Sequence, residues 1–205
     1  MSIYTMESVR RRALYKLGER EFHANSATED PVTLLYPEVL LEANRAGHWS
    51  WAKTRVLLQP GQVQDGMVPY TLPDDFLRLI SVKSGSDHTL MRDSWELRGR
   101  TIYVHEHVNH GPLTVRYTRN IQAASEDLPD EPAFIEYLVT LLAARVAPAI
   151  IGQAGIQLEG GLMQQAQQQF MTALTQDKQQ DSSNDQDPTR DLMTANILQM
   201  ATSRR

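Results

Sequence analysis

The spacing of apolar residues changes twice along this chain, and that change constrains the fold more than any other feature. Up to about residue 54, and again from about residue 121, apolar residues recur at intervals of three and four, which is typical of amphipathic helices. Between residues 55 and 120 they fall in short β-branched and aromatic runs with a period of two, which is typical of strands. This order predicts an α+β fold: an antiparallel helical bundle with an inserted antiparallel β-sheet domain and an extended C-terminal tail.

Both N-terminal helices have clear end signals. Thr5 is a suitable N-cap for the first helix, and Gly18 is a suitable terminator. Asp30 followed by Pro31 predicts the start of the second helix, because aspartate caps helices and proline fits the first turn. Gly47 is expected to end or bend this helix.

The middle of the chain predicts several antiparallel strands joined by short turns. No helix-length segment separates the strands, so hairpins are the expected connections. Turn residues such as Pro60-Gly61 and Gly111-Pro112 mark their ends. The predicted strands are residues 55–58, 70–72, 77–83, 89–91, 101–105 and 113–119.

The last third predicts two further helices and a tether. One opens at Glu131-Pro132 and is interrupted near Pro148, and the other covers about residues 156–177. Residues 176–187 contain no apolar side chain, so they are expected to be a linker. The resulting division is residues 1–54 and 121–177 for the bundle, 55–120 for the inserted region, and 178–205 for the linker and a terminal segment. The predicted bundle core includes Val39, Leu40, Leu138, Leu142 and Phe170.

Composition excludes several classes of protein. The 205 residues fit about one domain, and the lack of cysteine excludes disulfide scaffolds, thiolate metal sites and cysteine nucleophiles. A net charge of −5 argues against a protein that wraps nucleic acid. No apolar run is expected to reach the roughly 20 residues of a membrane span, and the N-terminus lacks a signal-peptide pattern. The expectation is therefore a soluble, non-secreted chain without a membrane partner.

A histidine cluster is the most tempting metal site. His105 and His107 share one face of a predicted strand end, and His110 follows three residues later. Imidazole groups beside Glu106 suit zinc or copper. However, no second cluster completes a ligand shell, and the segment lies just before a Gly-Pro turn. A hydrated loop is the better explanation, so no metal is predicted.

Catalytic motifs are weak or missing. Asp74 and Asp75 form a carboxylate pair, but Pro-Asp-Asp after a strand is typical turn chemistry. There is no nucleophile elbow, phosphate loop or zinc-protease motif, and the glycines from Gly155 to Gly160 do not follow a strand. The chain is therefore not expected to be an enzyme or to hold a cofactor.

Two groups of residues are candidates for contacts between subunits or layers. Arg10 and Arg11 belong to a basic run that is either a solvated helix face or a salt-bridge donor to a neighbouring subunit. Trp49 and Trp51 lie between a helix and the first strand, where tryptophan is usually core but also favours interfaces.

The order of several sequence pieces resembles the head-to-tail connector proteins of short-tailed bacteriophages, the tail tubular protein A or adaptor group. The resemblance covers about residues 5–177. It rests first on Trp49-Ser50-Trp51-Ala52 and then on Tyr70-Thr71-Leu72-Pro73-Asp74-Asp75-Phe76-Leu77-Arg78. Three further pieces follow in order: Val115-Arg116-Tyr117, Phe134-Ile135-Glu136-Tyr137-Leu138, and Leu141-Leu142-Ala143-Ala144-Arg145-Val146-Ala147.

The resemblance implies a structural virion protein at the head–tail junction, assembled in the host cytoplasm. Such adaptors form a homo-oligomeric ring, typically of twelve copies, between the portal and the tail nozzle or tail tube. Genomic DNA passes through the ring without sequence-specific binding, and an acidic ring suits that passage because like charge keeps DNA from sticking. The resemblance also implies a C-terminal segment that docks on the portal. Its predicted docking residues share one helix face: Leu192, Met193, Ile197 and Met200.

Two hypotheses from other classes remain open. One is a tail-associated, wall-degrading hydrolase that uses acidic residues such as Asp74 or Glu136. The other is a monomeric metal-binding protein built on the His105 cluster. For the terminal segment, the alternative to portal docking is that it folds back on its own bundle.

Overall fold

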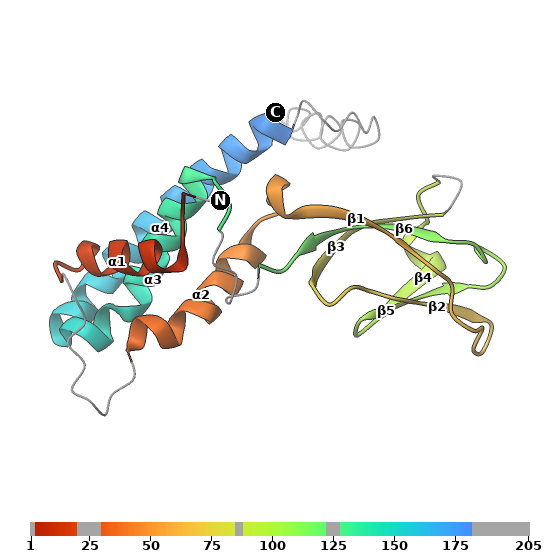
Figure 1. Ribbon diagram of the computed structural model, residues 1–205, viewed down its shortest axis with the longest axis horizontal. Coiled ribbons are helices and arrows are strands. Elements are labelled where there is room, and N and C mark those ends of the chain that lie inside the picture. The colour runs from red at the N-terminus through yellow and green to blue at the C-terminus, as the bar shows by residue number, and fades with distance from the viewer. Residues whose placement is uncertain (1–2, 20–29, 85–87, 122–127, 182–205) are drawn as a thin grey trace, which may run out of the picture.

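The computed structural model describes residues 3–19, 30–84, 88–121 and 128–181. In these residues the chain has two parts that lie end to end, a helical body and a β lobe (Figure 1). The helical body consists of α1 (Met6–Lys16), α2 (Pro31–Ala46), α3 (Pro132–Ile151) and α4 (Gln153–Asp181). The β lobe consists of β1 (Lys53–Leu58), β2 (Met67–Thr71), β3 (Phe76–Ser84), β4 (Trp95–Arg98), β5 (Thr101–His105) and β6 (Leu113–Arg119). The predicted α+β class, with strands inserted between helices, is confirmed.

The predicted helix ends are confirmed at α1 and α2. The Thr5 side chain accepts a hydrogen bond from Ser8 N, and the Ser8 hydroxyl in turn accepts one from Thr5 N, which completes a capping box. Gly18 takes a φ of +83°, the left-handed conformation that commonly follows a helix end. Asp30 accepts a hydrogen bond from Val32 N at 3.0 Å, and Pro31 lies in the first turn of α2.

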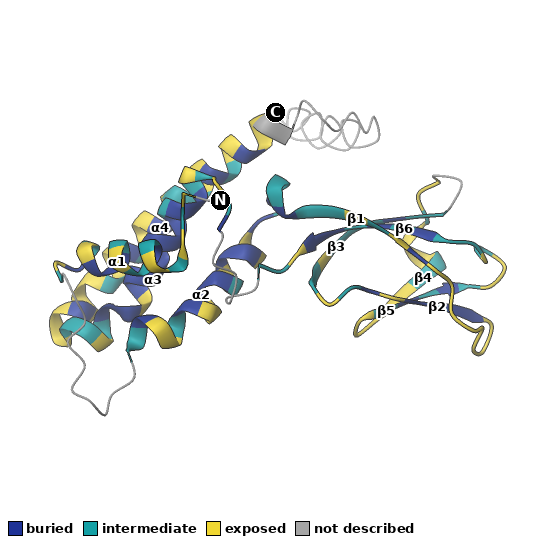
Figure 2. Cartoon of the chain, viewed as in Figure 1, coloured by how far each residue is buried: buried dark blue, intermediate teal, exposed yellow. Residues whose placement is uncertain are grey.

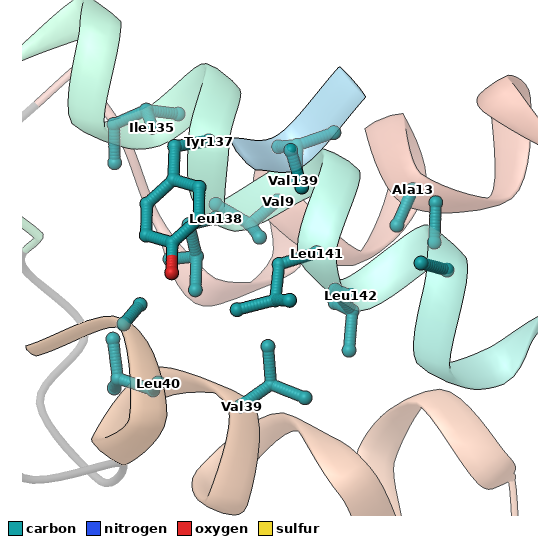
Figure 3. Close-up of a cluster of buried hydrophobic side chains, with 14 of the residues drawn as sticks. Val9, Ala13, Val39, Leu40, Ile135, Tyr137, Leu138, Val139, Leu141 and Leu142 are labelled. Carbon is teal, nitrogen blue, oxygen red and sulfur yellow. The ribbon is translucent and has the colours of Figure 1, made fainter. Parts of the chain in front are cut away.

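Helix α3 lies at the centre of the helical body and packs against α1, α2 and α4. Figure 3 shows side chains of α1 and α2 converging on α3. Phe170 is half-buried and packs against this core, whereas the other four predicted core residues are buried: Val39, Leu40, Leu138 and Leu142. The predicted packing of the helices that begin at Asp30 and Glu131 is therefore confirmed.

The predicted interruption at Pro148 is wrong. Helix α3 continues through Pro148 to Ile151, and α4 begins at Gln153 after Gly152 alone. Gly155 makes this tight connection possible, because a Cβ there would lie 2.0 Å from the Ala147 carbonyl oxygen. Two long helices can therefore pack along each other directly.

The inserted region is two antiparallel three-stranded sheets, where the sequence predicted one. Their strand orders are β1-β6-β3 and β2-β5-β4. Both sheets contribute side chains to one apolar cluster, which includes Val82, Val115, Tyr70 and Ile102. The β lobe therefore has its own core, separate from that of the helical body.

The strand predictions differ in accuracy. The strands at residues 101–105 and 113–119 have the predicted bounds, and β1, β2 and β3 differ from the predictions by one to three residues at their ends. The predicted strand at residues 89–91 is wrong, because only a single bridge joins Thr89 to Lys83. Strand β4 was missed: its charged residues Glu96 and Arg98 hide the strand pattern at a sheet edge.

The expectation that no apolar run reaches the length of a membrane span is also wrong. Helix α3 is long and apolar enough to span a membrane, by length and composition alone. Of the apolar stretch of α3, 67% is buried inside the chain, as expected for a central core helix.

Candidate assembly surfaces

The tryptophan motif forms the junction between the helical body and the β lobe. Trp49 is 1% exposed and lies edge-on to Phe134 and Phe170, with ring centroids 5.1 and 5.9 Å away. Its indole N–H donates to the Ala43 carbonyl at 3.0 Å. Trp51 is half-buried and packs on Phe134. Within one chain, both tryptophans belong to the core at the layer boundary, and their role between subunits stays a prediction.

Asp177 fixes the same junction, and the sequence analysis did not identify it. Its two carboxylate oxygens lie 2.9 Å from Ser50 N, and Oδ1 accepts a hydrogen bond from Ser50 Oγ at 2.6 Å. The residue is 6% exposed. Residues 178–181, which were expected to belong to a linker, are instead the last residues of α4. The only available signal was an aspartate in phase with the buried stripe of α4.

A third contact joins α2 to β6. Asn44 is completely buried, and its side-chain amide donates to the Arg119 carbonyl at 3.0 Å. Together with the Ser50–Asp177 contact, this hydrogen bond holds the β lobe in place against the helical body. A buried amide and a buried carboxylate lose much free energy without their partners, so both contacts are specific.

The two candidate arginines have different environments. Arg10 forms ion pairs with Asp30 and with Glu7, so its charge is used inside the chain. Burial alone would raise the pKa of Asp30, but hydrogen bonds from Thr33, Val32 N and Arg10 outweigh burial and hold it below its ordinary value. Arg11 is exposed, and so is Tyr15 one turn further along α1. Of the two arginines, Arg11 lies where a neighbouring subunit could contact it.

Helix α4 carries an outer face with little charge, because the one charged residue between Gln153 and Gln176, Glu159, is half-buried. From Gln153 to Gln176, about 36 Å of helix, every exposed residue is uncharged: glutamine, threonine, glycine, alanine, isoleucine, leucine or methionine. Ile156 and Met171 are 56% and 55% exposed. We call these exposed residues between Gln153 and Gln176 the α4 outer face, and Figure 2 shows exposed positions along this helix.

Two glycines within the α4 outer face have no packing partner among the described residues that would require glycine. A Cβ at Gly160 or Gly161 would meet no atom within 4 Å. Each glycine costs a helix about 1 kcal/mol relative to alanine. Charge depletion, exposed apolar side chains and room for a close approach are features of protein interfaces. The α4 outer face is therefore the best candidate for contact with another protein.

The histidines form a pair at the end of β5. The rings of His105 and His107 lie 5.4 Å apart between centroids, and His107 and His110 are exposed. Within the described residues, no group of three His, Asp or Glu side chains is placed to hold a metal ion. The structure thus adds no ligand to the pair, and the expectation that the chain binds no metal stays a prediction.

The acidic residues considered for hydrolysis lie in different parts of the molecule. Asp74 lies in the turn before β3 and pairs with Arg100 at 2.7 Å. Asp75 accepts a hydrogen bond from the Tyr117 hydroxyl at 2.8 Å; burial first, and then this carboxylate, raises the pKa of Tyr117 to about 12. Glu136 belongs to α3, where Arg12 and Lys16 flank it. The fold therefore gives each of these acids a structural partner and does not bring them together.

The predicted docking residues Leu192, Met193, Ile197 and Met200 lie outside the described residues.

No protein-family model matches this chain, and no curated protein sequence matches it significantly. The resemblance to phage connector proteins therefore stays a prediction.

Proposed function

We propose that this chain is the subunit of a connector ring that joins the portal to the tail nozzle or tail tube of a short-tailed bacteriophage. In this proposal the protein is a structural part of the virion and has no catalytic role. Its partners are further copies of itself, the portal and the tail, and genomic DNA passes through the ring.

The observation that carries the proposal is the α4 outer face. A chain with a net charge of −5 repels its own copies unless their contact surfaces avoid like charges. The α4 outer face meets this condition over about 36 Å. In a cyclic ring each copy also needs a second, different face. The exposed side of α1, with Arg11 and Tyr15, is a candidate because α3 separates α1 from α4.

The sequence pieces behind the resemblance also support the proposal, because they have structural roles here. Trp49 and Trp51 build the junction, and Tyr70 is buried in β2 with its hydroxyl donating to the Gly111 carbonyl at 2.8 Å. Leu142 lies in the centre of the helical body. A chain with two separate cores and a hydrogen-bonded junction suits a subunit that contacts different layers of a particle.

The test places charge on the α4 outer face. Gln157→Glu combined with Gln164→Glu adds two negative charges without an i,i+4 like-charge pair in one helix. We expect the self-association of the chain on portal rings, measured by native mass spectrometry, to fall by at least tenfold. The matched control, Gln59→Glu with Gln62→Glu, places the same charges in the exposed segment after β1. Equal assembly of the α4 variant and the control would contradict the proposal.

A second variant tests the terminal segment. Deletion of residues 188–205 is expected to leave a folded chain that no longer attaches to portal rings. Undiminished attachment of the truncated chain would show that the portal anchor lies elsewhere.

A further inference from the structure

Strand β4 forms one edge of the β2-β5-β4 sheet. The opposite edge, β2, is protected, because Pro69 has no backbone N–H and its carbonyl accepts a hydrogen bond from Gly61 N at 2.8 Å. Across the described residues, no strand or isolated bridge pairs with the outer side of β4. An open strand edge is a template for pairing with another strand, so β4 is the edge at which this sheet can be extended.

The turn between β4 and β5 decides which backbone groups of β4 point outward. Gly99 has a φ of +59° and Arg100 a negative φ, which is the pattern of a two-residue type II′ hairpin. In such a hairpin the flanking residues, Arg98 and Thr101, exchange backbone hydrogen bonds with each other, and hydrogen-bonded pairs then alternate along the ladder. The N–H and C=O of Leu97 therefore point to the outer edge.

Leu97 is the centre of this open edge. The Trp95 carbonyl also points outward, but it accepts a hydrogen bond from Arg92 at 3.4 Å. The Leu97 side chain is 37% exposed, although it lies on the core-facing side of the sheet, opposite the buried Ile102. A second strand at this edge would therefore meet an outward-facing donor and acceptor together with an exposed apolar side chain.

The residues on either side of Leu97 carry opposite charges on the outward face of β4. Glu96 and Arg98 form an ion pair at 2.6 Å, with side chains 53% and 63% exposed, so the pair adds little to the stability of one chain. If two β4 strands pair antiparallel about a two-fold axis at Leu97, Glu96 of each copy lies opposite Arg98 of the other. The four charges then alternate, and each carboxylate has an arginine on both sides.

The same charges oppose other registers of two β4 strands. A shift by two residues places Glu96 opposite Glu96 in one direction and Arg98 opposite Arg98 in the other, and directly opposed like charges destabilise a sheet. A shift by one residue would place the Leu97 side chain of the second copy on the wrong face. In-register parallel pairing would place each charge beside its own copy. The sequence of β4 therefore favours one arrangement of two copies.

We propose that two copies of the free chain pair through β4, antiparallel and centred on Leu97, and so join their three-stranded sheets into one sheet of six strands. So short a pairing buries far less than the roughly 1,200 Å² of a stable complex, and the dimer is therefore weak. The proposal does not rest on the connector function, because it uses the β lobe and not the α4 outer face.

The test is sedimentation velocity of the full chain at concentrations up to 1 mM. Glu96→Arg alone and Arg98→Glu alone each place like charges opposite each other twice, so each is expected to weaken dimerisation at least tenfold. The double variant, Glu96→Arg with Arg98→Glu, restores the alternation of charge and leaves the net charge unchanged. Its dimerisation is expected to lie within threefold of that of the unmodified chain.

Two further variants separate pairing from folding and from net charge. Leu97→Pro removes an outward N–H without removing a hydrogen bond between β4 and β5, so the chain is expected to stay folded by circular dichroism and to become monomeric. Arg78→Glu makes the same charge change as Arg98→Glu at an exposed position of the other sheet, and dimerisation is expected to stay within twofold.

Three results would overturn the proposal. The first is a chain that is entirely monomeric at 1 mM. The second is a double charge swap that weakens dimerisation as much as the single swaps do. The third is a dimer that Gln157→Glu with Gln164→Glu abolishes, because the contact would then lie on the α4 outer face.

Discussion

The helical body and the β lobe bury similar kinds of side chain but expose very different ones. The helical body presents the uncharged α4 outer face, with isoleucine, methionine and glutamine at its surface. The β lobe instead exposes charged side chains, such as Arg78, Glu96 and Arg98. The α4 outer face, which we propose as a protein contact surface, therefore differs from the charged surface of the β lobe. The following variants test how far the two parts are independent.

The largest effect is expected in the centre of the helical body. Leu142 is 0% exposed, so Leu142→Asp buries an unpaired charge and is expected to cost roughly 3–5 kcal/mol. This destabilisation is measured as a loss of the helical circular dichroism signal or of soluble protein. Met171→Asp on the α4 outer face is the control and is expected to change stability by less than about 0.5 kcal/mol. A soluble, fully helical Leu142→Asp variant would contradict the assigned core.

The next effect is expected at the junction between the two parts. Asp177→Ala removes the acceptor for Ser50 N and Ser50 Oγ and is expected to cost about 1–3 kcal/mol in urea unfolding. Asp177→Asn keeps one acceptor oxygen and is expected to lose less. If Asp177→Ala unfolds at the same urea concentration as the unmodified chain, this carboxylate does not hold the parts together.

A smaller effect is expected inside the β lobe. Tyr117→Phe removes the hydrogen bond to Asp75 but keeps the ring that packs on Phe76, so the expected cost is about 1 kcal/mol. Because the two parts have separate cores, we expect the Tyr117→Phe chain to self-associate through the α4 outer face as the unmodified chain does. Loss of assembly together with this small destabilisation would show that the two parts are coupled more strongly than their cores suggest.

The smallest effect concerns Glu131, at the start of α3. Burial, with added repulsion from Asp177 and Asp130, raises the pKa of Glu131 above its ordinary value. The folded chain therefore binds this proton more tightly than the unfolded chain, and stability falls as pH rises through the raised pKa. Glu131→Gln removes that loss, so thermal unfolding is expected to shift upward slightly at pH 7 and not at pH 4. An equal shift at both pH values would show that the loss of stability does not come from ionisation of the Glu131 carboxyl.

Local signals in the sequence predicted local structure well. Thr5, Gly18 and Asp30 act through neighbouring backbone groups, and they end or begin helices where expected. The division into two sheets was not predictable in the same way, because strand pairing such as β1 with β6 joins residues far apart in the chain. Arg55 and Arg116, for example, become neighbours only through that register.

The candidate surfaces show the same limit. The sequence identified Trp49 and Trp51 as a layer boundary, and the structure confirms the boundary because aromatic pairs contact within a short segment and α3. Asp177 lies where the predicted helix of residues 156–177 and the predicted polar linker of residues 176–187 overlap, and its burial depends on Ser50, 127 residues away. Polar composition therefore marks a linker only where no distant partner buries the polar group.

Electron microscopy of the chain mixed with candidate portal rings tests the proposed connector function most directly. We expect an additional ring of density on one face of the portal, present with the Gln59→Glu, Gln62→Glu control and absent with Gln157→Glu, Gln164→Glu. Portal rings that remain undecorated by the unmodified chain at concentrations where it is folded would contradict the proposed connector function.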